Sequence, residues 1–282
     1  MNDFLPNSSL TAVQPSFYFD FEDYRERKPR NPILQQYIGS FYEIITKSNS
    51  VSSVPVVPDG CMDIIFISDY NETRPYLLKT AQAILGMCVS SNRNVLGIRF
   101  KPVGISKFIH YASDESSTYM IPLEEFNGTE KLCIHEFNHN YSFEAKCSIL
   151  EEILLQSLIE NDTKMELTQQ IANYIIRQNG IVTVEQLSRE YFYSTRYINK
   201  LFHENVGMSP KKFCEIVQLQ NVLSTVCTTT DKMASVAAQT GYYDQSHMNH
   251  VVKRLLNTTS SKLRNNEFFE EIRENLDIKY FY

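Results

Sequence analysis

Two pairs of helices form the clearest pattern along the chain, and they lie about fifty residues apart within residues 183–264. In the first pair, Thr183 and Gln186 form a capping-box pair that opens one helix. Ser194 can cap a second helix, because it comes just before a run with helical spacing. The apolar positions of that second helix are Ile198, Leu201 and Phe202.

The second pair repeats this order over residues 231–259. Val236 and Ala237 lie on its first helix, and Gly241 ends that helix. The apolar positions of its second helix are Met248, Val251, Val252 and Leu255. A short helix, a tight turn and a longer helix with a polar N-terminal face is the geometry that places side chains in a major groove. The repetition therefore makes double-stranded DNA the expected partner.

Residues 1–140 follow a different pattern, which is typical of strands. A Pro-Asp-Gly turn at residues 58–60 opens the first clear strand, and residues 105–112 are interpreted as a helix. The expected strands are residues 62–67, 83–88 and 94–102. The fold class is therefore predicted as α+β, with a β-rich, barrel- or sandwich-like N-terminal domain followed by an all-α domain with two helix-turn-helix units.

Residues 141–164 connect the two domains, and a helix is expected at residues 144–160. Its apolar stripe consists of Leu150, Ile153, Leu154 and Leu158. The stripe can pair with its twin in a homodimer or pack against its own N-terminal domain, and the sequence leaves both interpretations open. At the end of the chain, residues 267–282 are expected to form an acidic helical tail. Its apolar side would carry Phe269, Ile272 and Leu276.

Both helical pairs and their connector share residues with a known family. The shared residues are Tyr193-Ser194, Leu201-Phe202, the run from Val206 to Phe213, Val236-Ala237, Gly241-Tyr242 and the run from Asp244 to His247. They resemble the DNA-binding domain of AraC/XylS-type transcription regulators. The resemblance implies that residues 165–266 bind DNA, with RNA polymerase as a further partner and a homodimer as the assembly. The departures from the family pattern are Gln218, Met248, His250, Val252, Asn257 and Ser260.

Base-reading side chains are expected opposite the apolar positions of each second helix. Arg and Lys can pair with guanine, Gln and Asn with adenine, and hydroxyl groups with several base edges. The expected base-reading residues are Thr195, Arg196, Tyr197, Asn199, Lys200, Gln245, Ser246, His247, Asn249 and His250. The expected phosphate contacts are Lys211, Lys212, Lys253 and Arg254. Because most departures lie in the second unit, the first unit is predicted to contribute more base selectivity.

The N-terminal domain carries a shorter resemblance. Residues 58–66 and 97–104 are similar to sensor domains attached to some members of the same family, which implies a pocket for a small-molecule effector. Arg99 and Lys101 occupy alternate strand positions and share a face, which could hold an acidic effector or simply face solvent. The alternative is a domain with a filled core that only dimerises or binds a partner protein.

The distribution of charge agrees with these assignments. The whole chain carries −6, but residues 1–164 carry −7, residues 165–266 carry +4 and the last sixteen residues carry −3. The positive segment contains the tandem units, and a polyanionic partner requires positive charge there.

Other classes of protein lack support in the sequence. No run of about eighteen apolar residues occurs and no signal peptide is evident at the N-terminus, so a cytoplasmic protein without a membrane partner is expected. The spacing of Cys133, His135 and His139 could reach a metal, but a polar surface segment explains it equally well, and no metal or other cofactor is expected. A DNA-repair enzyme would need an activated cysteine beside a histidine, as in a Pro-Cys-His run, and none of the six cysteines has that context. The chain is therefore not expected to be an enzyme.

Overall fold

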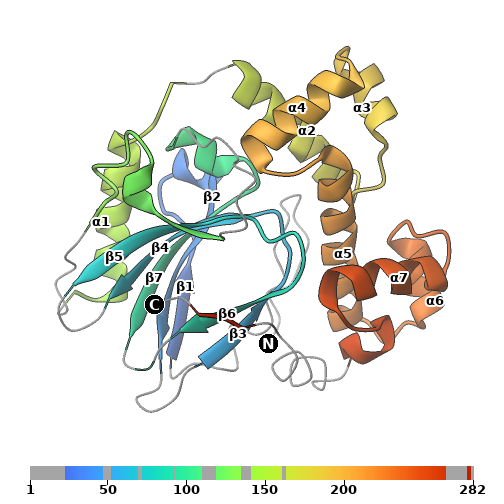
Figure 1. The fold of residues 1–282 in the computed structure, drawn as a ribbon, viewed down its shortest axis with the longest axis horizontal. Helices are drawn as coiled ribbons and strands as arrows, with labels where there is room; N and C mark the ends of the chain where they lie inside the picture. The colour runs from blue at the N-terminus through green and yellow to red at the C-terminus, as the bar shows by residue number, and fades with distance from the viewer. Residues whose placement is uncertain are drawn as a thin grey trace.

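The computed structural model describes residues 23–46, 52–68, 72–89, 91, 93–109, 119–134, 141–160, 163–264 and 278–280. Within these residues, a β-rich N-terminal domain stands beside a helical domain built around one long helix, α5 (Pro210–Thr228), as Figure 1 shows. The α+β fold class is confirmed.

The N-terminal domain contains a six-stranded antiparallel sheet in the order β1-β2-β7-β4-β5-β8. Its strands are β1 (Asp23–Arg27), β2 (Ile38–Ile45), β4 (Met62–Ser68), β5 (Thr73–Leu78), β7 (Asn94–Phe100) and β8 (Met120–Pro122). Because side chains alternate along a strand, Ile64 and Phe66 join one apolar cluster while Ile65 and Ile67 join another on the opposite face. Both faces of the central strands are buried, which explains their nearly continuous apolar sequence.

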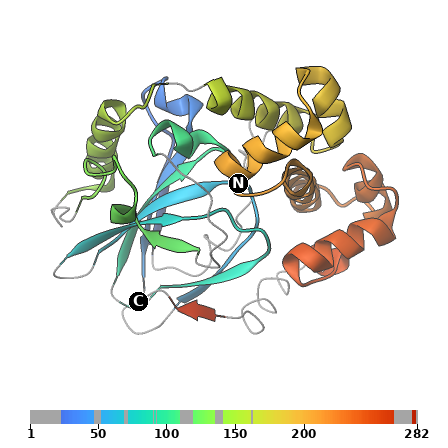
Figure 2. The same ribbon diagram turned by 45° about the horizontal axis from the view of Figure 1, so that its top comes forward.

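A second, smaller sheet includes the C-terminal end of the chain. It consists of β3 (Ser52–Val56), β6 (Leu85–Val89) and β9 (Ile278–Tyr280). The β9 strand runs parallel to β6, so the chain returns to the N-terminal domain after the helical domain, as Figure 2 also shows. A helical tail was expected for residues 267–282, and this is wrong for residues 278–280, which form a strand. The edge of β6 offers backbone groups with which an extended segment can pair. Phe269, Ile272 and Leu276 lie outside the described residues.

The connecting helix α1 (Phe143–Gln156) packs on the N-terminal domain. Leu150 and Leu154 are fully buried in the same cluster as Phe66, with Ile153 and Leu158 partly buried against it. The stripe is therefore not free to form a dimer seam, and the dimer assignment of these four leucine and isoleucine residues is corrected in favour of the alternative. The helix packs on its own domain because the sheet presents an apolar face within the same chain.

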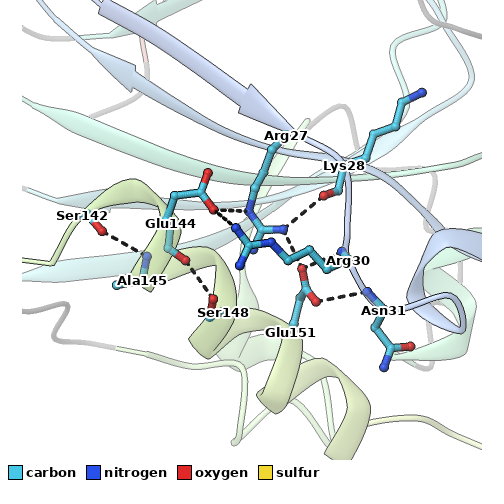
Figure 3. Close-up of polar contacts among 9 residues, drawn as sticks. All are labelled: Arg27, Lys28, Arg30, Asn31, Ser142, Glu144, Ala145, Ser148 and Glu151. Atoms are coloured by element: carbon cyan, nitrogen blue, oxygen red, sulfur yellow. Dashed lines mark hydrogen bonds and ion pairs between the residues drawn. The ribbon is translucent and has the colours of Figure 1, made fainter.

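Polar contacts join α1 to β1 and to the chain that follows it (Figure 3). The Glu151 carboxylate accepts hydrogen bonds from Arg27 Nη1 at 2.7 Å, from the Arg30 backbone N–H at 2.9 Å and from the Asn31 backbone N–H at 3.3 Å. Beside this group, Glu144 Oε2 pairs with Arg30 Nη2 at 2.6 Å. These contacts tie α1 to the chain that follows β1.

Short 3-10 helices complete the connections. They are η2 (Leu34–Gln36), η3 (Gly104–Lys107), η4 (Leu123–Glu125) and η5 (Ser260–Arg264). The η3 turn replaces the helix expected over residues 105–112, of which residues 110–112 lie outside the described part. It begins after Val103, whose φ of 67° is left-handed and rarely adopted by a β-branched residue.

The helical domain has the expected two units on either side of α5. Its other helices are α2 (Thr163–Arg177), α3 (Val184–Tyr191), α4 (Thr195–Val206), α6 (Met233–Gln239) and α7 (Gln245–Leu256). Local sequence sets their starts: the Thr183–Gln186 capping box is present, and Ser194, Ser209 and Asp244 each accept a hydrogen bond from the first turn of the helix they precede. One apolar cluster fills the first unit and another fills the second.

Candidate nucleic-acid interface

The two reading helices, α4 and α7, are buried along one side and exposed along the other. Ile198, Leu201 and Phe202 anchor α4, while Met248 and Val252 anchor α7. On the opposite sides, the exposed members of the expected base-reading set are Arg196, Lys200, Gln245, Ser246, His247 and His250. The half-buried members are Thr195, Tyr197, Asn199 and Asn249.

Two of the expected base-reading residues have internal partners. Asn199 Nδ2 donates to the Thr195 carbonyl at 2.8 Å, one turn back in α4. Asn249 Oδ1 accepts hydrogen bonds from the backbone N–H of Ser260, at 3.3 Å, and from its hydroxyl group. Asn249 therefore joins α7 to η5 through its Oδ1 atom, and its assignment as a base-reading residue stays a prediction. Sequence alone could not show this contact, because Ser260 lies eleven positions away in a separate turn.

The four expected phosphate ligands differ in their surroundings. Lys211 and Lys253 are exposed. Lys212 is half-buried, and burial lowers the pKa of its ammonium group. Arg254 Nη2 lies 2.9 Å from Glu215 Oε2, so it pairs α7 with α5. Lys211 and Lys253 are consequently the better candidates for phosphate contacts, because neither forms an ion pair with a carboxylate among the described residues.

Each unit also presents an exposed aromatic residue in the turn before its reading helix. Phe192 and Tyr243 are both 93% exposed. Phe192 has a left-handed φ of 57°, and the ring of Tyr193 beside it packs at a tilt against Tyr197, with ring centroids 5.2 Å apart. Phe192 and Tyr243 are not among the DNA contacts expected from the sequence. The signal was present as an aromatic pair before each N-cap, Phe192-Tyr193 and Tyr242-Tyr243.

Comparison with protein families agrees with this geometry. Residues 187–266 match the model of a helix-turn-helix domain family. This part of the chain is an AraC-type helix-turn-helix domain. Residues 25–121 match a second model, described as a domain of unknown function, DUF6597. A comparison with curated proteins finds no match.

Several solved structures are similar to the chain at low identity. ToxT from Vibrio cholerae is 14% identical over 86% of this chain and 98% of its own, with a TM-score of 0.40. A probable AraC family transcriptional regulator from Rhodopseudomonas palustris is 23% identical over 35% of this chain and 94% of its own, with a TM-score of 0.32. The C-terminal domain of AraT, a response regulator from Geobacillus stearothermophilus, is 14% identical over 41% of this chain and 91% of its own, with a TM-score of 0.34.

A buried polar cluster lies in the N-terminal domain, facing the AraC-type domain at one end. Arg99 pairs with Asp63 at 3.3 Å and with Asp59 at 3.5 Å, and the Tyr42 hydroxyl donates to Asp63 at 2.8 Å. These carboxylates raise the pKa of the Arg99 guanidinium, although burial opposes them. Arg99 is therefore engaged by its own domain.

Lys101, the other expected effector ligand, is also engaged. Its ammonium group donates to the Gln35 carbonyl at 2.6 Å, and burial lowers its pKa. Both cations thus have oxygen partners within the domain, and the expectation that Arg99 and Lys101 together hold an acidic effector stays a prediction.

The remaining features of the described residues concern membrane spans, metal clusters and clefts. No helix among them is both long and apolar enough to cross a membrane. They contain no group of three or more His, Cys, Asp or Glu side chains placed to bind a metal, while His135 and His139 lie outside them. A cleft of about 320 Å³ lies on the AraC-type side, between α2 and α3, and is lined in part by Tyr174, Gln178 and Arg189.

Proposed function

We propose that the chain is a cytoplasmic, sequence-specific DNA-binding transcription regulator, with residues 165–266 as its DNA-binding domain. The observation that carries the proposal is the pair of reading helices, each with an exposed polar N-terminal half and each capped by a preceding Ser or Asp. Two such helices on one domain can enter successive major-groove segments about one helical turn apart. One chain would then read an asymmetric site, with Arg196, Gln245 and His247 at the base edges. No catalytic role is assigned.

The expected contacts separate into two classes that mutation can distinguish. Arg196→Ala is expected to cost about 1 to 3 kcal/mol at one base position and to relax the preference there, because a bidentate contact to guanine is lost. Lys253→Ala is expected to weaken all sequences about equally, because a phosphate contact carries no sequence information. Selection from a randomised duplex pool followed by measurement of Kd on the selected site and on single-base variants would check both.

Arg177→Ala is the matched control, because Arg177 is an exposed arginine at the end of α2, away from the reading helices. It is expected to leave sequence preference unchanged. Failure of the full chain to select any sequence would refute the proposal. A larger effect on preference from Gln245→Ala than from Arg196→Ala would refute the ranking of the two units.

The N-terminal domain is proposed to control DNA binding, through a small-molecule effector in the family's manner or through a partner protein. One observation favours the second candidate. The two faces of the large sheet are occupied by side chains such as Phe41, Phe100 and Ile65, which are buried in two apolar clusters. RNA polymerase and a second copy of the chain are proposed as further partners, and a homodimer would use a surface other than the α1 stripe.

A further inference from the structure

One loop of the N-terminal domain touches the C-terminal ends of both reading helices. This bridging loop, residues 79–84, joins β5 to β6. Gln82 Nε2 donates to the carbonyl of Gly207, the C-cap of α4, at 3.2 Å. The Ile84 backbone N–H donates to the carbonyl of Leu255, in the last turn of α7, at 2.8 Å. The last carbonyls of a helix have no partner within it, so the loop supplies one to each reading helix.

The N-terminal domain also contributes one valine to the core of each helix-turn-helix unit. Val103 lies in the first unit's cluster with Phe202 and Phe213. Val57 lies in the second unit's cluster with Val252 and Leu255, and it is fully buried. The left-handed backbone of Val103 is a costly conformation for a β-branched residue, and the packing of its side chain between the domains offsets that cost.

A third contact holds the connector between the two units. Gln220 of α5 is buried and donates to the Pro58 carbonyl at 2.7 Å. Gly60 in the same turn lies against the ring of Phe213, where an added Cβ would come within 2.7 Å of the ring. Asp59 in this turn pairs with Arg99, so the contact continues into the buried cluster of the sheet. The N-terminal domain therefore touches α4, α5 and α7 together (Figure 1).

We propose that the N-terminal domain sets the spacing between the two reading helices, with Gln82 and Val57 as positioning residues for DNA recognition. This inference rests on the proposed DNA-binding function. Each reading helix has 12 residues and is held at its C-terminal end. Its N-terminal end lies about 18 Å away, so a tilt of about 10° moves the reading end by about 3 Å. That displacement is close to the rise of one base pair, about 3.4 Å.

The test uses the full chain and the site that it selects from a randomised duplex pool. Duplexes are then made in which the segments read by the two helices are moved together or apart by one and two base pairs. The wild-type chain is expected to lose affinity at least tenfold for each one-base-pair change. The variant Gln82→Ala/Val57→Ala is expected to lose threefold or less, because its helices are free to adjust, while it still binds the original site.

The matched control is Gln35→Ala/Val95→Ala. Gln35 donates its amide to a backbone carbonyl and Val95 is a buried valine, but both make these contacts within the N-terminal domain. This control is expected to keep the wild-type spacing penalty. If the double variant at the bridging positions does not fold, Gln82→Ala alone is used, since this side chain is exposed. It is expected to reduce the one-base-pair penalty at least twofold.

Four outcomes would overturn the inference. An unchanged penalty in the bridging variants would mean that α5 alone fixes the spacing. If the control variant lost as much of the spacing penalty as the bridging variant does, general destabilisation would be the cause. A wild-type chain that selects a site but tolerates every spacing would overturn this inference and leave the DNA-binding proposal intact. A wild-type chain that selects no site would overturn both.

Discussion

At the scale of the residue, Phe192 combines two unfavourable properties. Its backbone is left-handed, with φ at 57°, and its side chain is 93% exposed. A side chain larger than glycine costs about 1 to 2 kcal/mol in this conformation. The ring buries almost nothing within the chain that would offset this cost. Tyr243, at the matching turn, is equally exposed but has no positive φ.

Phe192→Gly is therefore expected to stabilise the protein by about 1 kcal/mol, because glycine adopts the left-handed conformation without a steric penalty. Urea denaturation of the full chain checks this through the midpoint at constant slope. Tyr243→Gly serves as the control and is expected to change stability in the opposite direction, by about 0.5 to 1 kcal/mol, because glycine only adds freedom to the unfolded chain there. Destabilisation by Phe192→Gly would show that the ring has a packing role.

At the scale of the element, α1 depends on a carboxylate that was not singled out from the sequence. Glu151 and its partner Arg27 are each 12% exposed. The same carboxylate also accepts two backbone N–H groups from the chain after β1. Removing it would leave a mostly buried guanidinium without its nearest anion, and this is the costly way to break a buried ion pair.

Glu151→Ala is expected to lower the free energy of unfolding by about 3 kcal/mol. Glu152→Ala is the matched control, because Glu152 is the next residue on α1 and is exposed. Its effect is expected to stay within about 0.5 kcal/mol. Chemical denaturation of the two variants makes the comparison, and equal effects would contradict the role given to Glu151.

At the scale of the whole molecule, the two domains share their interiors. Val57 and Val103 belong to the N-terminal domain by sequence, but they are buried in the cores of the two helix-turn-helix units. The β9 strand connects the two domains a second time, because the chain after the helical domain pairs with β6 of the N-terminal domain. Separating the domains would expose apolar surface on both of them.

Thermal unfolding is consequently expected to occur in one cooperative transition, because neither domain keeps its full core without the other. Far-ultraviolet circular dichroism, dominated by the helices, and near-ultraviolet circular dichroism of the tyrosines should give the same midpoint. Two transitions with different midpoints would show that the domains unfold independently, and that the shared valines contribute little to stability.

The sequence by itself determined the features that depend on neighbours along the chain. The helix starts at Thr183, Ser194 and Asp244, the apolar sides of α4 and α7, and the strand after the Pro-Asp-Gly turn all follow from residues within a few positions of each other. Hydrogen bonds within a helix and its caps span three or four residues, so their sequence signals are local. The AraC-type domain could be recognised for this reason.

The tertiary structure alone decided which long-range partners these elements have. Arg99 and Asp63 are 36 positions apart, Arg27 and Glu151 are 124 apart, and Gln82 and Gly207 are 125 apart. The sequence shows that an apolar stripe or a strand edge must be covered, but it does not show by what. The cover can come from a second copy of the chain, from the same domain or from a distant segment. The α1 stripe is covered by its own domain and β6 pairs with the end of the chain, and both partners lie far away in the sequence.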